Sequence, residues 1–273
     1  MKTLLLFLLT LFIPASAFAK CASGSISCMS GSVDSKTKRI TLNRNGLIIL
    51  HFSGQTVPFA RELNKTYPVY LLSGGNKVSL LPMETYTGYG TIEVVLKPET
   101  LLNAGDTYTL KIDSLPEYYR LKERYNEESK QWVPWSFEIT ELLDTTIPTL
   151  IAAPAERGKK FMRFGCGPVS HVYFSLKGKD NSALFVLATL KSLGGVNKQK
   201  HIVKIYGDSV KIGHSMCSGD FSLGMGKCYE ITFQLMDQSG NLSAASKPIE
   251  FVAPGVNDNP YARKMNRLGS ANQ

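Results

Sequence analysis

Apolar and polar side chains alternate from Tyr229 to Leu235, which predicts a strand with one buried face. Turn residues occupy positions 237–241, and the alternation resumes at 249–251. We therefore expect the last two strands of a β-sandwich in this stretch. The same plan appears earlier, because a turn-rich segment leads into alternating apolar positions at 102–112.

Further short apolar or alternating segments, each bounded by Gly, Pro or Asn, recur through the chain. They lie at 40–42, 47–52, 70–72, 78–80, 92–96, 135–139, 171–176, 184–188 and 202–206. Strands at this spacing with turns between them are typical of sandwiches. The sequence predicts an all-β protein with two tandem sandwich domains, and the stretch 144–148, which ends in Pro148, marks the joint.

The start of the chain has the pattern of a secretory signal peptide: Lys2, an apolar run over 4–13, and small residues up to Ala19. The apolar run is about half of the ~20 residues that span a bilayer, so cleavage is favoured over anchoring, and we expect no transmembrane segment in the mature chain. The predicted segments are a signal peptide at 1–19, an extension at 20–37, domains at 38–143 and 144–253, and a disordered tail at 254–273.

The chain carries a formal net charge of +9, with 31 Lys and Arg against 22 Asp and Glu. That balance favours acidic partners such as lipid head groups, envelope polymers or nucleic acid. Export and the lack of a nucleic-acid module disfavour nucleic acid. We therefore expect a periplasmic or secreted bacterial protein whose partner is an envelope protein or an anionic glycan.

Three motifs then suggest a family. They are NGLIILHFS at 45–53, VVLKP at 94–98 and LNAGDTYTLKI at 102–112. Together they resemble the bacterial immunoglobulin-like domains of surface-layer and other exported proteins, over residues 38–140. The resemblance implies two tandem immunoglobulin-like sandwiches, and it implies that Tyr108 ties its hydroxyl to the preceding turn. In the second domain, we expect Tyr229 to have a structural and not a functional role.

The five cysteines all follow the predicted signal peptide, in a compartment that permits disulfides. Two short loops would be closed by pairing Cys21 with Cys28 and Cys217 with Cys228, which leaves Cys166 free. The alternative of Cys166 with Cys228 has the separation of an inter-sheet bridge and stays open.

Residues 114–133 break the strand pattern and combine aromatic with cationic side chains, the types that anchor interfaces. They form either a short helix or a long hairpin loop, and either a solvated loop or a recognition loop. The candidates for partner binding are Tyr118, Tyr119, Arg120, Lys122, Arg124, Tyr125 and Trp132, with Lys159, Lys160 and Arg163 in a second basic cluster.

Catalytic and metal motifs are weak. The chain has no G-x-S-x-G, and its four histidines are too scattered for a spaced metal motif. We predict a non-catalytic binding or scaffolding protein without a cofactor. The alternative is a periplasmic metal-binding protein or hydrolase that uses Cys166, His171, His201 and His214. Asp237 and Asn241 suggest either a calcium ligand pair or a turn stabilised by hydrogen bonds.

Overall fold

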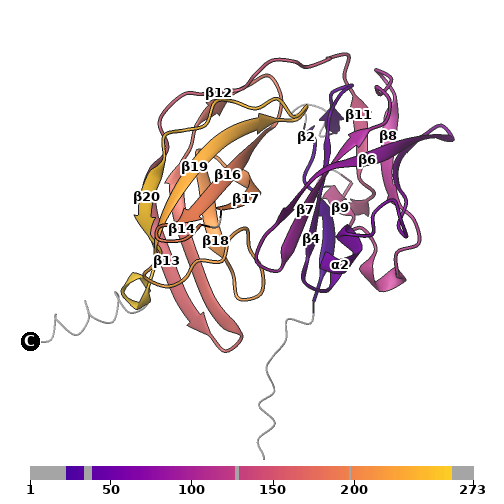
Figure 1. Cartoon of the computed structure of the whole chain (residues 1–273). Coiled ribbons are helices and arrows are strands. Elements are labelled where there is room, and N and C mark those ends of the chain that lie inside the picture. The colour runs from indigo at the N-terminus through magenta and orange to yellow at the C-terminus, as the bar shows by residue number, and fades with distance from the viewer. Residues whose placement is uncertain (1–22, 34–38, 127–128, 197, 260–273) are drawn as a thin grey trace, which may run out of the picture.

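The computed structural model describes residues 23–33, 39–126, 129–196 and 198–259 (Figure 1). The described elements are strands joined by turns and a few short helical segments, so the predicted all-β class is confirmed. The predicted signal peptide at 1–19, Cys21 and the part of the predicted tail after residue 259 lie outside the described residues. No helix among the described residues is long and apolar enough to cross a bilayer.

The N-terminal half contains a nine-stranded sheet and one small hairpin. The sheet order is β1-β4-β7-β6-β5-β8-β11-β3-β2, and only the β11–β3 pair is parallel. The elements are β1 (Ser25–Cys28), β2 (Ser32–Val33), β3 (Ile40–Leu42), β4 (Ile48–Ser53), η2 (Gly54–Thr56), α2 (Val57–Ala60), β5 (Val69–Ser73), β6 (Asn76–Thr87), β7 (Thr91–Pro98), β8 (Thr107–Ile112), η3 (Glu117–Tyr119), β9 (Arg124–Asn126), β10 (Gln131–Val133) and β11 (Ser136–Ile139).

Strand β6 joins the two parts of this sheet, one that contains β5 and one that contains β7. Its first four residues pair with β5, and the rest pair with β7, with a register shift between Pro82 and Glu84. A bulge bends a strand and increases its twist, so a single strand can pair with neighbours in both parts of the sheet. The apolar cluster of this half contains Phe52, Leu80 and Phe137, all fully buried.

The C-terminal half contains a seven-stranded antiparallel sheet in the order β13-β14-β18-β17-β16-β19-β20, with a separate pair β12–β15. Its elements are β12 (Thr149–Leu150), β13 (Ala155–Phe164), β14 (Gly167–Ser175), β15 (Gly178–Lys179), β16 (Leu184–Ser192), β17 (Lys198–Tyr206), β18 (Ser209–His214), β19 (Cys228–Asp237), β20 (Ile249–Val252) and η4 (Val256–Asp258). Strand β17 pairs with β16 along most of its length and with β18 at its end. A second apolar cluster includes Phe174, Phe221 and Phe233.

The two halves lie side by side in Figure 1 and share a third apolar cluster. Ile49 and Val95 of the N-terminal half pack there with Phe185 and Ile202 of the C-terminal half. Backbone hydrogen bonds flank the cluster. Tyr89 and Gly219 exchange two at 2.8 Å, and on the other side Leu47 donates to Gln238 O, also at 2.8 Å.

One tyrosine in each half fixes the turn that precedes its strand. The Tyr108 hydroxyl accepts a hydrogen bond from the Asn103 amide at 3.4 Å. The Tyr229 hydroxyl accepts one from the Gly224 amide at 2.9 Å. Both rings are buried, so each tyrosine links an apolar core to a surface turn.

Residues 20–37 were expected to be an extension outside the core, and this is wrong for the part that the structure describes. Strand β1 pairs with β4, and its alternate side chains Ile26 and Cys28 are buried. Only two apolar positions carry the pattern in this Ser-rich stretch, which is too few to distinguish a strand from a loop. Strands β13 and β18 were also missed, because Lys and Gly interrupt their apolar positions.

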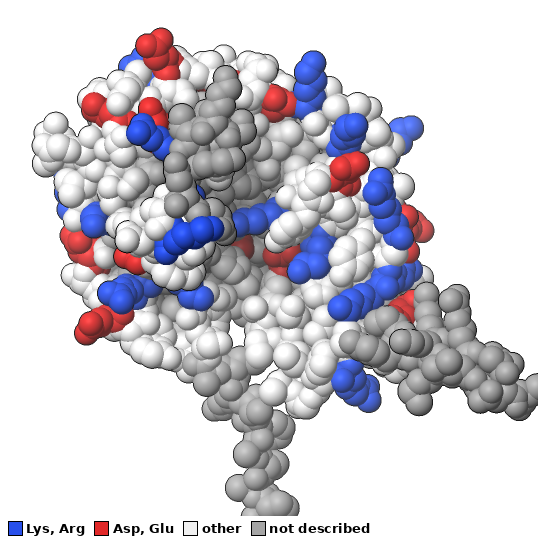
Figure 2. Space-filling model, turned by 180° about the vertical axis from the view of Figure 1, so that it is seen from behind, with Lys and Arg blue, Asp and Glu red and all other residues white. Residues whose placement is uncertain are grey.

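The surface charges do not gather into one block on the face that Figure 2 shows, where basic side chains are interspersed with acidic ones. Lys159 and Lys160 are half-buried and Arg163 is exposed, all on β13, and Lys159 pairs with Glu156 at 3.3 Å. Because β13 is an edge strand of its sheet, its charges also hinder pairing with another strand.

Candidate functional site

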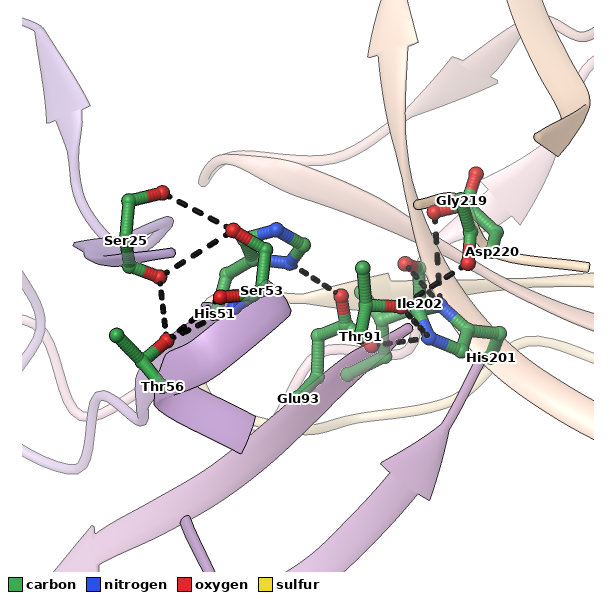
Figure 3. A network of polar contacts seen from close by, with 10 residues as sticks. All are labelled: Ser25, His51, Ser53, Thr56, Thr91, Glu93, His201, Ile202, Gly219 and Asp220. Carbon is green, nitrogen blue, oxygen red and sulfur yellow. Dashed lines mark hydrogen bonds and ion pairs between the residues drawn. The ribbon is translucent and has the colours of Figure 1, made fainter. Parts of the chain in front are cut away.

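Two imidazoles and two carboxylates meet where the halves join (Figure 3). His51 on β4 and Glu93 on β7 come from the N-terminal half. His201 on β17 and Asp220, which follows β18, come from the C-terminal half. One donor atom each of Glu93, His201 and Asp220 lies within 4.8 Å of the other two. This group is called the junction cluster below, with His51 as its fourth member.

Strand alternation places His51 and Glu93 on the junction side of the N-terminal half. Along β7, Ile92, Val94 and Leu96 face the N-terminal core, and Val95 faces the junction. Glu93 has the same parity as Val95, and it pairs across the sheet with His51. Their side chains form a hydrogen bond of 2.6 Å between His51 Nδ1 and Glu93 Oε1.

Glu93 and His201 form an ion pair between the halves, and both are almost fully buried, with 1% and 0% of the side chain exposed. His201 Nε2 contacts Glu93 Oε2, while His201 Nδ1 lies 3.1 Å from the carbonyl oxygen of Ile202. Thr91 Oγ1, which donates to Gly219 O, lies 3.4 Å from the same Nε2. A side chain at Gly88 would collide with this nitrogen, because a Cβ there would lie 2.7 Å away.

The ionised forms of this pair are stabilised against the cost of burial. Burial opposes ionisation of Glu93, yet contacts with His201 and His51 lower its pKa. Burial likewise opposes protonation of His201, and the Glu93 carboxylate outweighs it and raises the pKa. Asp220 responds differently: burial, with a contribution from Glu93, raises its pKa to about 6.

A cavity of about 290 Å³ opens beside the cluster and is lined by both halves. Its walls include His51, Glu93 and Asp220, together with His171, Lys204 and Lys211. Burial lowers the pKa of His171 to about 4, with electrostatic contributions from the neighbouring side chains Lys211, His214 and Lys160. The cavity therefore combines neutral imidazole, carboxylate and ammonium groups, a mixture that suits small polar ligands or ions.

The alternative Cys/His site is only partly assembled. Cys166 is exposed in the turn between β13 and β14, and it belongs to neither group of potential metal ligands in the described residues. His171 and His214 lie on neighbouring strands, where His214 packs on Tyr89. His201 joins Glu93 and Asp220 instead. Sequence reasoning missed both carboxylates, although an acid inside the apolar run at 92–96 was a signal for Glu93.

The cysteines differ from the predicted pairing. Cys28 is buried with a free thiol, and Cys228 is exposed with a free thiol, so the pairs Cys21–Cys28 and Cys217–Cys228 are not formed in the structure. The alternative of Cys166 with Cys228 is not formed either. Cys28 occupies an inward position of β1, where burial raises its pKa to about 12. Cys166 is a free thiol, and Cys217 is not among the free ones.

In the described part of this segment, Glu117–Tyr119 form a short 3-10 turn and β9 pairs with β10, rather than forming a regular helix. Tyr125 and Trp132 oppose each other across the hairpin, with ring centroids 5.4 Å apart, and Trp132 is 65% exposed. Tyr118 is 83% exposed and packs edge-on against Tyr119, whose hydroxyl donates to Gln55. Arg120 and Lys122 are exposed, and Arg124 is half-buried.

Asp237 organises its turn by hydrogen bonds, which is the second of the two readings of this motif. Its Oδ1 accepts from the amides of Ser239 and Asn241, both at 2.8 Å, and its Oδ2 accepts from the Asn241 side chain at 2.7 Å. Asp144 and Asp180 approach Asp237 closely enough to form a second group of potential cation ligands. Burial raises the pKa of Asp237, and Asp144 contributes to the rise.

No known family model matches the chain, and no curated protein does. Among solved structures, the chain is similar to dimeric latent PorU from Porphyromonas gingivalis, with a TM-score of 0.32 and 14% identity over 88% of this chain and 21% of that one. It is similar to tandem Ig repeats of Dlar, with a TM-score of 0.24 and 10% identity over 82% of this chain and 95% of that one. It is also similar to the N-terminal part of the bacterial S-layer protein SbsC, with a TM-score of 0.23 and 11% identity over 84% of this chain and 44% of that one.

The chain thus spans about a fifth of the PorU chain and less than half of the SbsC fragment. TM-scores below 0.5 at these identities carry no argument about function.

Proposed function

We propose that the chain is an exported, immunoglobulin-like, non-catalytic binding or scaffolding protein of the bacterial cell envelope. Its partner is an envelope protein or an anionic glycan. The observation that carries the proposal is the exposed aromatic pair Tyr125 and Trp132, which a two-stranded hairpin holds in a fixed arrangement outside the core. Large exposed aromatic side chains are costly in water and are typical of interface centres.

The surroundings of the pair suit a binding surface. Tyr118 adds a third exposed ring within the same segment, and Arg120 and Lys122 add cations beside the rings. Aromatic rings supply contact area at a low cost in side-chain entropy, and arginine binds carboxylate or phosphate groups in a defined geometry. The basic overall balance of the chain directs such a surface towards acidic partners.

The test is capture of a partner by the mature chain from envelope extracts, compared with the variant Tyr125→Ser/Trp132→Ser. We expect the variant to keep its far-ultraviolet spectrum and melting temperature, because both side chains are exposed, and to lose the captured material. Val196→Ser is the matched control, since Val196 is 95% exposed and lies in the other half.

Protease treatment of the extract before capture distinguishes a protein partner from a glycan. Equal recovery with the wild type and the double variant would remove the hairpin from the proposed function. Replacing Arg120 and Lys122 by alanine then shows whether their charges contribute to partner binding. If they do, the loss of captured partner is larger at low salt than at high salt.

A further inference from the structure

The junction cluster brings nitrogen and oxygen atoms together in an arrangement that either a proton or a metal ion completes. His201 Nδ1 lies 3.1 Å from the Ile202 carbonyl oxygen and 3.7 Å from Asp220 Oδ1, so both acceptors favour the proton on Nδ1 whenever the ring is neutral. The lone pair of Nε2 then points at Glu93 Oε2. Two acceptors face each other there, and Thr91 Oγ1, whose proton goes to Gly219 O, is a third.

Glu93 shows the same requirement from the carboxylate side. Its side chain is 1% exposed, and Oε1 is satisfied by His51. Apart from its contact with His201 Nε2, Oε2 has no hydrogen-bond partner among the described residues. A buried carboxylate oxygen is costly unless a proton donor or a metal ion neutralises it. The pair is completed either by a second proton on His201 or by a metal ion in that position.

We propose that the junction cluster is a binding site for a divalent metal ion of the zinc class, formed by both halves of the chain together. His201, Glu93 and Asp220 are the ligands, and each offers one donor atom within 4.8 Å of the others. Imidazole nitrogen and carboxylate oxygen are ligands that Zn²⁺ accepts in three-residue sites. The cavity beside Asp220 gives access to solvent, which supplies the remaining ligand.

The outer groups are those that a metal site requires. A ligating imidazole normally donates its second N–H to a carbonyl or carboxylate, as His201 Nδ1 does to Ile202 O. His51 has the equivalent role for Glu93, because it holds Oε1 at 2.6 Å and leaves Oε2 directed to the cluster. This site is independent of the hairpin of the proposed function, which lies on other elements.

The experiment loads the mature chain with zinc at pH 7.5 and removes loosely bound ions by dialysis, followed by metal analysis. We expect one zinc per chain and a higher melting temperature with metal than without. A ligand that binds only the folded state raises stability by mass action. Cobalt in place of zinc is expected to give the visible absorption of a low-coordinate nitrogen and oxygen site.

Variants assign the site. Asp220→Asn is expected to lower the affinity by more than the ~10–100-fold that outer-shell changes cause, and His51→Gln to lower it within that range. Asp180→Asn is the matched control, since it removes one carboxylate from the other acidic group, and His171→Gln controls for the second imidazole of the cavity. Both controls are expected to retain one zinc.

Three results would overturn the proposal. They are no zinc retained by the wild type, full retention by a folded Asp220→Asn, and loss of zinc in either control. Melting of each variant without metal separates loss of the site from loss of the fold. If the wild type retains no metal, the junction cluster is a buried ion pair completed by a proton.

Discussion

Glu93 on β7 and His201 on β17 contact each other across the junction, although 108 positions separate them in the chain. Neither half contains both members of the pair. The contact therefore reports whether the two halves have joined, and it lies beside the apolar cluster of Ile49, Val95 and Phe185.

Removing Glu93 is expected to be costly, because it leaves His201 without its counter-charge in a buried position. We expect Glu93→Ala to lower the free energy of unfolding by about 3–5 kcal/mol in chemical denaturation. The control is Glu138→Ala, whose partner Arg39 is 67% exposed, with an expected loss below ~1 kcal/mol. Similar losses for the two variants would contradict the importance of the buried pair.

Phe185→Ala tests the apolar part of the junction. Phe185 is 5% exposed and packs in the third cluster, so truncation is expected to cost about 3–5 kcal/mol. Because the cluster joins the halves, we also expect thermal unfolding to separate into two transitions in calorimetry. Val196→Ala, at an exposed position, should leave a single transition at the original temperature. One unshifted transition in Phe185→Ala would show that the halves are coupled elsewhere.

Thiol reactivity follows burial. Cys28 is 2% exposed, and burial raises its pKa to about 12, so it carries almost no thiolate at neutral pH. We expect an alkylating reagent to label Cys166 and Cys228 in the folded protein and Cys28 only after denaturation. Peptide mass spectrometry of each fraction assigns the sites. Rapid labelling of Cys28 in the folded protein would place β1 outside the sheet.

Acid is expected to destabilise the protein through His171. Its pKa is about 4 in the folded protein against an ordinary value of 6.5, so the unfolded chain binds more protons between these values. Stability is therefore lost as the pH falls from 6.5 towards 4, by up to about 3 kcal/mol. The variant His171→Gln should show a smaller loss in denaturant titrations at pH 7 and pH 4.5. Equal losses would mean that other titratable groups carry the acid response.

The sequence predicted the strands that have one clearly buried face. The alternation from Tyr229 to Leu235 corresponds to β19, and the apolar run at 47–52 corresponds to β4. Both patterns consist of neighbouring apolar and polar residues, which can be recognised in a single sequence. Strand β1 was missed because only two of its four residues, Ile26 and Cys28, are apolar, and its position depends on pairing with β4.

The candidate site could not be predicted in the same way, because it depends on the docking of two sheets. His201 was named as a possible ligand, but with Cys166, which lies in an exposed turn. Asp220 is part of no sequence motif, and it approaches Glu93 only in the tertiary structure. A glutamate within the apolar run at 92–96 was the one local sign, because a charge in a buried strand needs a partner.

The apolar junction also has a consequence for biosynthesis. A growing chain that ends before Phe185 has already completed the strands that carry Ile49 and Val95, but it lacks the surface that covers them. Such a fragment exposes an apolar surface, together with Glu93 without its partner His201, for as long as translation needs to deliver the remaining residues. We expect prematurely terminated chains to bind chaperones and to be cleaved by proteases, whereas the full chain buries this surface in the junction.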